Sequence, residues 1–253
     1  MVKIEVQDVS EENIKFTLSG CTLAFANALR RVILTEIPTL AIEIVQYDKN
    51  YTVIPEEMTT DRLGLIPIDS TNAERYQYTK DCSCKDYCSQ CSVSILLDVS
   101  NTTDTVRSVT SKSFFVEGNG PQVGDSTFPS LITRLGINQS IKCKCIAVKG
   151  KGKTHSKWSP VSAVAFGYDG DNKHGHTRYW HEQNINAEWP AAWFMPEDAQ
   201  AQSEEFIYDK EPETFFFDVE VVKACLSPEE VLFRAMKILG DKFQQIFEAL
   251  EDR

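Results

Sequence analysis

Residues 21–46, CTLAFANALRRVILTEIPTLAIEIVQ, predict a helix followed directly by a strand. Apolar residues recur at helical spacing as far as Ile37 and make a broad stripe, which is the pattern of a helix that packs on a core. Pro38 ends this helix because proline lacks a backbone N–H. The run TLAIEIVQY that follows alternates in the manner of a strand with one buried face.

The residues before this stretch predict two strands joined by a turn. Ile4 and Val6 alternate with charged residues, and the alternation resumes over residues 14–18. Ser19-Gly20 then favours a turn. The chain therefore begins strand, turn, strand, helix, strand.

The C-terminal residues repeat the order of strand and helix. The run TFFFDVEVV at residues 214–222 alternates as a strand does, and SPEE at 227–230 is a capping box with proline at the first helical position. The helix that follows this cap has more apolar residues than one narrow packing face would need. Its stripe fits an internal core and a partner interface equally well.

The middle of the chain has a different residue pattern from its two ends. Residues 47–175 combine short strand patterns, a cysteine-rich loop and many turn residues. We therefore expect an α+β fold in which strands and two helices from both chain ends form one discontinuous domain, and the middle forms an inserted β-rich domain. The expected boundaries are residues 1–46, 47–175 and 176–253.

The loop KDCSCKDYCSQCS, residues 80–92, holds half of the chain's eight cysteines. Cys82, Cys84, Cys88 and Cys91 follow the spacing Cys-x-Cys-x3-Cys-x2-Cys. Four thiolates on a short polar loop can close a tetrahedron around Zn²⁺ with bonds of about 2.3 Å. Because all four positions belong to the protein, no site remains for water or substrate, and such a zinc ion is structural.

Other arrangements also fit this loop. The four cysteines can be unligated, although exposed free thiols are a liability, or they can hold an iron–sulfur cluster, since four thiolates also suit iron. The spacing of His174, His176 and His181 also allows a rival metal site. Their segment is rich in Gly, Asn and Asp, so we interpret them as surface histidines on a loop.

The remaining cysteines have the pattern of core residues. Cys143 and Cys145 alternate with two lysines in SIKCKCIAV, so the two thiols share one face of a predicted strand. We expect them to be buried as small hydrophobic residues. Cys21 and Cys225 stand at the ends of predicted elements and are expected in the core or at its boundary.

Composition excludes some classes of protein. The chain has 253 residues and a formal net charge of −11, whereas a free-standing nucleic-acid binder needs a basic surface. The N-terminus lacks the apolar segment of a secretory signal, and no apolar run approaches the ~20 residues of a membrane span. We expect an intracellular protein whose thiols stay reduced.

Three blocks of the sequence resemble the alpha-type subunits of cellular RNA polymerases. Residues 21–46 are similar to the first signature of this family, and YTVIPEEMTTDRLGLIPI, residues 51–68, is similar to the second. KGKTHSKWSPVSAVAFGY, residues 151–168, resembles a third block that is typical of archaeal (D-type) and eukaryotic members. The cysteine loop looks like that of the third-largest subunits of eukaryotic RNA polymerase II. The counterparts in polymerases I and III usually lack it.

The resemblance implies that both chain ends form a dimerisation domain. That domain would pack against a smaller alpha-like subunit through helices at residues 22–37 and 228–251. The implied interface residues are Phe25, Leu29, Val32, Ile33, Leu239, Phe243, Ile246 and Leu250.

The resemblance also implies further neighbours. Arg30, Arg31 and Arg62 would dock the large polymerase subunits that carry the catalytic chemistry. The inserted domain and its zinc loop would contact the second-largest subunit and small zinc-containing subunits. DNA and RNA would be reached only through the complex, no membrane is involved, and the location is the nucleus.

The expected function is a non-catalytic scaffold of DNA-directed RNA polymerase II. With one structural Zn²⁺, it would pair with the smaller alpha-like subunit and nucleate assembly of the catalytic subunits for mRNA transcription. One rival is a one-zinc enzyme, which needs an open coordination site and a general base, and the sequence shows neither in recognisable form. Another rival is a stand-alone zinc adaptor, which would fold as a monomer without a partner.

Overall fold

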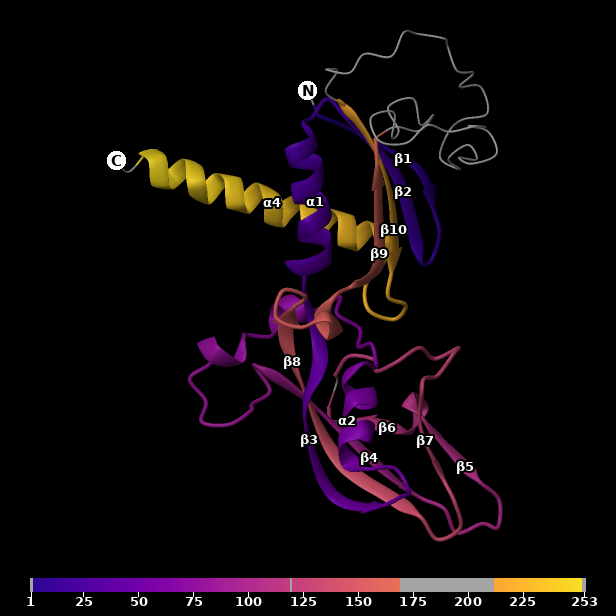
Figure 1. Cartoon of the computed structure of the whole chain (residues 1–253). Helices are drawn as coiled ribbons and strands as arrows, with labels where there is room; N and C mark the ends of the chain where they lie inside the picture. Colours follow the sequence, from indigo (N-terminus) through magenta and orange to yellow (C-terminus); the bar gives the residue numbers. More distant parts are fainter. Residues whose placement is uncertain (1, 119, 169–211, 252–253) are drawn as a thin grey trace, which may run out of the picture.

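The computed structural model describes residues 2–118, 120–168 and 212–251. Figure 1 shows a mixed α/β fold in which α1 (Leu23–Thr35), α4 (Pro228–Glu251) and one sheet lie above a second sheet. The first sheet has the strand order β1-β2-β10-β9, with β1 Lys3–Val9, β2 Asn13–Ser19, β10 Thr214–Val221 and β9 Val161–Gly167. The second has the order β3-β8-β4-β6, with β3 Pro38–Tyr51, β8 Ser140–Lys151, β4 Ser92–Ser100 and β6 Phe114–Val116.

The other described elements are a two-stranded ribbon, three α-helices and four short 3-10 helices. A two-stranded ribbon pairs β5 Arg107–Thr110 with β7 Leu131–Leu135. The α-helices are α1 Leu23–Thr35, α2 Glu56–Gly64 and α4 Pro228–Glu251. Single turns of 3-10 helix are η1 Ala73–Arg75, η2 Thr79–Asp81, η3 Ser111–Ser113 and η4 Ser156–Trp158.

Both predicted helix starts are present. Thr22 caps α1, where its hydroxyl accepts a hydrogen bond from the Phe25 N–H at 3.3 Å. Ser227 does the same for α4, accepting from the Glu230 N–H at 3.3 Å. α1 ends at Thr35, slightly before the predicted end, and β3 begins at Pro38.

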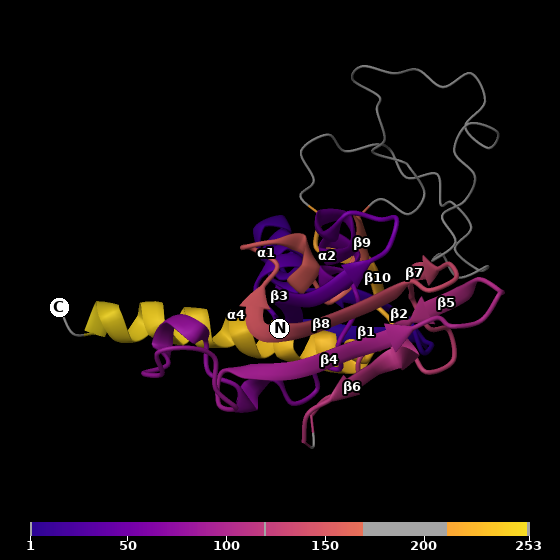
Figure 2. The same cartoon turned by 90° about the horizontal axis from the view of Figure 1, so that it is seen from below.

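The first sheet and the two long helices share one core. Alternate residues of β2 and β10 face α1 and α4, and the rings of Phe16 and Phe217 stack with centroids 4.7 Å apart. α4 contributes Val231, Ala235 and Leu239 to this core. Beyond them, residues 240–251 are all exposed, and this half of α4 projects away from the body. In Figure 2, seen from below, β3, β8, β4 and β6 lie side by side while α4 extends past them.

The division between the two sheets differs from the expected domain boundaries. β9, residues 161–167, pairs with β10 and so lies in the sheet of the chain ends, not in the inserted segment. β3 pairs with β8 from Pro38 onward, so residues 38–46 lie in the second sheet. Sequence alternation marks strands but does not show which strands pair, which explains both differences.

The segment GKGKTHSKWSP, residues 150–160, joins the two sheets. Gly150 and Gly152 stand where a Cβ would overlap the Trp158 ring and the Leu34 carbonyl oxygen, respectively. The Trp158 indole donates a hydrogen bond to the Val148 carbonyl at 3.1 Å, and the Thr39 hydroxyl donates to the Trp158 carbonyl at 2.7 Å. These glycines allow the close packing that holds β8 against the end of α1.

A second junction lies at the start of α4. The buried Arg234 side chain donates to the carbonyls of Ser70 at 3.2 Å and Thr71 at 2.7 Å, and to the Glu230 carboxylate at 2.8 Å. The Ser70 N–H donates to the Cys225 carbonyl at 2.8 Å. The loop that follows α2 is therefore fastened to α4.

Candidate metal centre and partner surface

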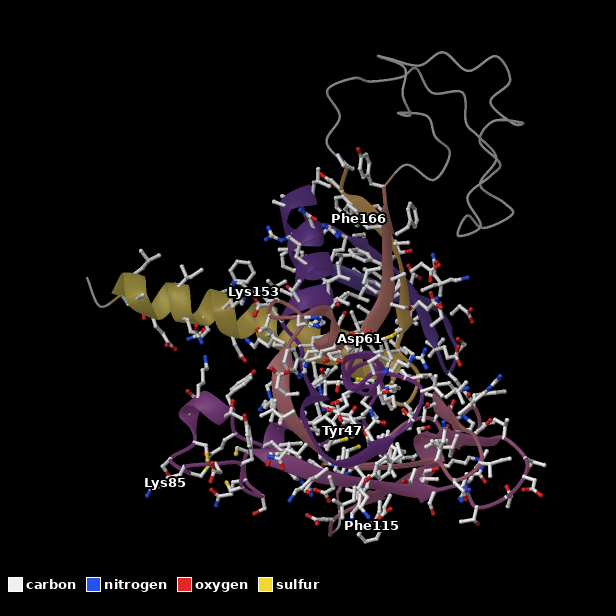
Figure 3. All side chains as sticks on the ribbon, turned by 60° about the horizontal axis from the view of Figure 1, so that its bottom comes forward. Tyr47, Asp61, Lys85, Phe115, Lys153 and Phe166 are labelled. Carbon is white, nitrogen blue, oxygen red and sulfur yellow. The ribbon has the colours of Figure 1, made fainter. Side chains whose placement is uncertain are left out.

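The four loop cysteines lie between η2 and β4. Cys82 follows η2 directly, and Cys91 comes immediately before the first residue of β4. The loop leaves the second sheet on the side toward which α4 projects, and Figure 3 shows Lys85 at its outer edge.

The four sulfur atoms converge on one point. All four lie within 4.8 Å of one another. The Sγ–Sγ distances for the pairs Cys82–Cys88, Cys84–Cys91 and Cys88–Cys91 are each 3.7 Å. A tetrahedron with bonds of about 2.3 Å from a central ion to sulfur has edges of about 3.8 Å. The side chains are therefore spaced as four ligands of a single ion.

A tight turn positions the last two of these ligands. The Cys88 carbonyl accepts hydrogen bonds from the N–H groups of Cys91 at 3.0 Å and Ser92 at 2.9 Å. The Cys88 N–H in turn donates to the Cys91 sulfur at 3.4 Å. N–H donors directed at sulfur stabilise a thiolate, which is the form that binds metal.

This centre offers no open position for chemistry. Four protein ligands would complete the tetrahedron around an ion held here and would leave no position for water or substrate. In the described part of the chain, no other cluster of His, Cys, Asp or Glu has metal-ligand geometry. His174, His176 and His181, the rival set, lie outside the described residues.

The other cysteines are core residues, as their patterns predict. Cys143 and Cys145 are 2% and 0% exposed, with their sulfur atoms 3.9 Å apart. Cys225 is buried beside the Ser70 hydroxyl, and burial raises the pKa of its thiol to about 11. Cys21 is half-buried just before α1. Cys143, Cys145 and Cys225 are therefore buried in the core and pack as small hydrophobic groups.

The exposed half of α4 carries an apolar face. Phe243, Ile246, Phe247 and Leu250 are 53–65% exposed and follow the spacing i, i+3, i+4, i+7, which places them on one side of the helix. Phe247 was not among the predicted interface residues, although its spacing from Phe243 identifies it. Contiguous apolar surface of this kind marks an interaction site.

The other predicted interface residues divide into two groups. Leu29, Val32, Ile33 and Leu239 are at most 6% exposed and pack inside this chain. This corrects the expectation for these four residues, because the stripe of α1 is already covered by the first sheet and by α4. Phe25 is half-buried, and its ring stacks on Phe243 with centroids 6.4 Å apart. It therefore borders the exposed face.

The three predicted docking arginines have different surroundings. Arg30 donates two hydrogen bonds to the Asn27 side-chain oxygen, at 3.1 and 2.9 Å. Arg31 is exposed on α1. Arg62 donates to the Ile132 carbonyl at 3.0 Å and so ties α2 to β7. The Arg62 guanidinium therefore holds two elements of this chain together.

No helix among the described residues combines the length and the apolar character needed to cross a membrane.

Comparisons with known proteins agree with this geometry. Residues 15–243 match the family described as the RNA polymerase Rpb3/Rpb11 dimerisation domain. The chain is 38% identical to DNA-directed RNA polymerase II subunit RPB3 of Schizosaccharomyces pombe over an alignment 263 positions long, which covers 98% of this chain and 87% of that protein. It is 39% identical to the rpb3 subunit of Dictyostelium discoideum, over 65% of this chain and 57% of that protein.

An archaeal relative extends the comparison. The polymerase subunit Rpo3 of Methanothermobacter thermautotrophicus is 31% identical over 65% of this chain and 61% of its own length. The family match covers most of this chain, and eukaryotic and archaeal polymerase subunits both align with it. The chain therefore belongs to the RNA polymerase Rpb3/Rpb11 dimerisation-domain family, as a member similar to the non-catalytic RPB3 subunits.

Proposed function

We propose that this chain is an assembly subunit of DNA-directed RNA polymerase II that pairs with a smaller alpha-like subunit through α4. The heterodimer then recruits the large subunits that carry out mRNA synthesis in the nucleus. The relatives named as RPB3 and Rpo3 support membership of a polymerase. The choice of polymerase II rests on the names of the eukaryotic relatives and on the cysteine loop.

The exposed apolar half of α4 carries this proposal. Phe243, Ile246, Phe247 and Leu250 contact solvent in the isolated chain, and leaving such side chains exposed is unfavourable by about 25 cal/mol per Å² of apolar area. A permanent interface resembles a protein core cut in half. The inner half of α4 is anchored in the core of this chain, so the outer half is presented as a rigid arm to a partner.

We further propose that the cysteine loop holds one structural zinc ion. The 3.7 Å sulfur separations match a single tetrahedral ion and leave no room for several iron and sulfide atoms. The bound ion would fix a loop that otherwise has little core of its own. Lys80 and Lys85, nearby in sequence, can offset part of the negative charge of the four thiolates.

The net charge of −11 supports a position away from the nucleic acid. In this arrangement Arg30 and Arg31 lie at the surface of α1 that meets the large subunits. The second sheet and the cysteine loop face the second-largest subunit and the small zinc-containing subunits.

A stand-alone zinc adaptor is the alternative function, and pairing distinguishes the two. Ile246→Asp and Leu250→Asp change exposed side chains, so the fold should remain intact. Co-expressed with the smaller alpha-like subunit, each variant should lose about 2 kcal/mol or more of pairing free energy. Phe115→Asp, which alters a side chain 66% exposed on β6, is the control and should pair normally. Unchanged pairing of all three variants would contradict the proposal.

A further inference from the structure

The four loop cysteines are open to solvent as well as close together. Cys82, Cys84 and Cys88 are half-buried, and the side chains between the cysteines, residues 83, 85–87, 89 and 90, are all exposed. Figure 3 shows sulfur atoms, in yellow, on the loop that carries Lys85 at its outer edge. Of the four loop thiols, Cys91 is the shielded one, at 0% exposed. A small oxidant dissolved in water therefore reaches three of these sulfur atoms.

The other four cysteines are placed differently. Cys143, Cys145 and Cys225 are at most 7% exposed. Cys21 is half-buried, and none of the sulfur contacts among the described residues involves it. Oxidation to a disulfide needs a thiolate that solvent reaches and a second sulfur beside it. In the described part of the chain, the cysteine loop alone meets both conditions.

Metal binding keeps the loop sulfurs in their reactive form. A cysteine that binds zinc is deprotonated, and the thiolate, not the thiol, is the nucleophile. A peroxide oxidises a thiolate to a sulfenic acid, which condenses with a neighbouring thiol to give a disulfide. Every loop sulfur has such a neighbour at 3.7 Å. The second step therefore needs only local movement of an exposed loop.

The sulfur contacts select one pairing. Four cysteines allow three connectivities. The pairs Cys82–Cys88 and Cys84–Cys91 are both 3.7 Å apart and together use each cysteine once. The contact Cys88–Cys91 would leave Cys82 to pair with Cys84, and a ring with one residue between its cysteines is short and stiff. The third connectivity, Cys82 with Cys91 and Cys84 with Cys88, has no such contact among the described residues.

Accessibility sets the order of the two disulfides. Cys82 and Cys88 are both half-buried, so an oxidant reaches either sulfur of this pair. In the other pair, Cys84 is reachable and Cys91 is not. Cys91 is also held in the turn that starts at Cys88, where its N–H donates to the Cys88 carbonyl at 3.0 Å. The Cys82–Cys88 bond should therefore form first.

We infer that the cysteine loop is a reversible oxidation site for hydrogen peroxide, with Cys82–Cys88 as the first disulfide and Cys84–Cys91 as the second. In the first step one thiolate attacks a peroxide oxygen, the O–O bond breaks, and a sulfenic acid and a hydroxide form. The partner thiolate then attacks the oxidised sulfur, the S–S bond forms, and a second hydroxide leaves. For each disulfide, two thiolates lose two electrons to one peroxide, and two protons from solvent convert the hydroxides to water.

The first disulfide opens the metal site. It removes two of the four ligands, so the loop no longer completes a tetrahedron and cannot retain its zinc. An exposed disulfide is readily reduced, so cellular thiols reverse the reaction and restore the ligands. This inference rests on the proposed function, since the zinc-bound loop proposed there is its starting state.

Disulfide mapping tests the site directly. The tagged full chain, copurified with the smaller alpha-like subunit, is treated with hydrogen peroxide. The remaining thiols are then alkylated under denaturing conditions, and the chain is digested without reduction. Mass spectrometry should identify Cys82–Cys88 first and Cys84–Cys91 later, with the three buried cysteines alkylated. Another connectivity, higher sulfur oxides without a disulfide, or reduced loop cysteines overturns the inference.

Zinc release gives an independent readout. A chromogenic chelator should register the loss of about one zinc ion per chain as the first disulfide forms. Dithiothreitol followed by added zinc should restore the metal content. Cys143→Ser is the control and should release zinc at the wild-type rate, because this buried thiol takes no part. Zinc that stays bound while the disulfides form, or slower release from the control, contradicts the inference.

The same mapping on the chain purified from peroxide-treated cells tests the site in the assembly. Cys82 and Cys88 should be more oxidised than in untreated cells and should return to the reduced form after peroxide is removed. Loop thiols that stay unchanged in treated cells would show that neighbouring subunits shield them, and this overturns the inference.

The two proposals fail in different ways. If the native chain enters no polymerase, or is purified without zinc, the proposed function or its metal site is wrong. If the chain enters the polymerase with zinc bound and its loop cysteines stay reduced in peroxide, the proposed function stands and the loop is not an oxidation site.

Discussion

The Glu36 carboxylate lies 3.0 Å from the Lys242 ammonium and joins the end of α1 to the point where α4 leaves the core. Its other oxygen lies 3.2 Å from Lys151 on β8. On α4, the residue next to Lys242 is Phe243, whose ring stacks on Phe25 near the start of α1. Figure 1 shows α4 crossing α1, and these contacts brace α4 on both sides of the crossing and so set the direction of its exposed half.

The Glu36 brace predicts a pH effect on stability. Burial alone raises the pKa of Glu36, but hydrogen bonds and charge interactions with Lys242 and Lys151 outweigh it and leave the pKa below its ordinary value. A lowered folded-state pKa contributes stability above the unfolded-state pKa, and this contribution is lost as the pH falls through the folded-state value. Glu36→Gln should cost about 1 kcal/mol at pH 7.

Chemical denaturation of both proteins between pH 7 and about pH 3 measures this effect. The difference in unfolding free energy between wild type and Glu36→Gln should shrink as the pH falls below about 5. A difference that stays constant over this range would show that the carboxylate charge contributes nothing.

Cys88→Ser should abolish stoichiometric metal binding, because three thiolates and a hydroxyl form a much poorer zinc site. The loop around residues 79–91 should become more accessible to protease, because the metal no longer crosslinks it. The metal content of the purified chain, measured by mass spectrometry, is the readout. Cys143→Ser, which removes a buried thiol outside the loop, is the matched control and should retain the metal. Full zinc in Cys88→Ser would disprove the ligand assignment.

Gly150→Ala should destabilise the chain by about 1–3 kcal/mol, because the new methyl group overlaps the Trp158 ring and must displace it. Gly167→Ala is the control, since a Cβ at Gly167 has no neighbour within 4 Å. Thermal unfolding of the two variants gives the comparison. Equal melting temperatures would show that Trp158 moves without cost and does not fasten β8 to α1.

Arg234→Met should cost about 3 kcal/mol, because it leaves the Ser70 and Thr71 carbonyls without their buried donor. Hydrogen exchange should rise at the Ser70 amide, which pairs with the Cys225 carbonyl. Lys237→Met, an exposed cation on the same helix, should change neither quantity. Native exchange at Ser70 in the Arg234 variant would mean that this junction is held by other contacts.

Local patterns predict much of this fold but not its pairing. The helix and strand of residues 21–46 and the capped start of α4 follow from apolar spacing and capping residues, and the structure has all three. α2 was not predicted, because only Thr59 and Leu63 of its residues are buried and its apolar period is weak. The place of β9 depends on pairing with β10, which lies far along the chain.

The candidate sites show the same limit. The cysteine spacing identifies four side chains that the structure brings together, because all four lie on one short loop. The apolar stripe of α4 is continuous in sequence, so it does not show where burial ends. Only the folded chain reveals that Leu239 is in the core and that Ile246 is exposed.

Purification of the tagged chain from its native cells under moderate salt tests the central claim most directly. Mass spectrometry identifies the copurifying proteins, and the metal is counted on the isolated subunit. We predict a stoichiometric multisubunit RNA polymerase II that contains the smaller alpha-like subunit, with about one zinc ion on this chain. A lone zinc-containing monomer would contradict the account and favour the adaptor.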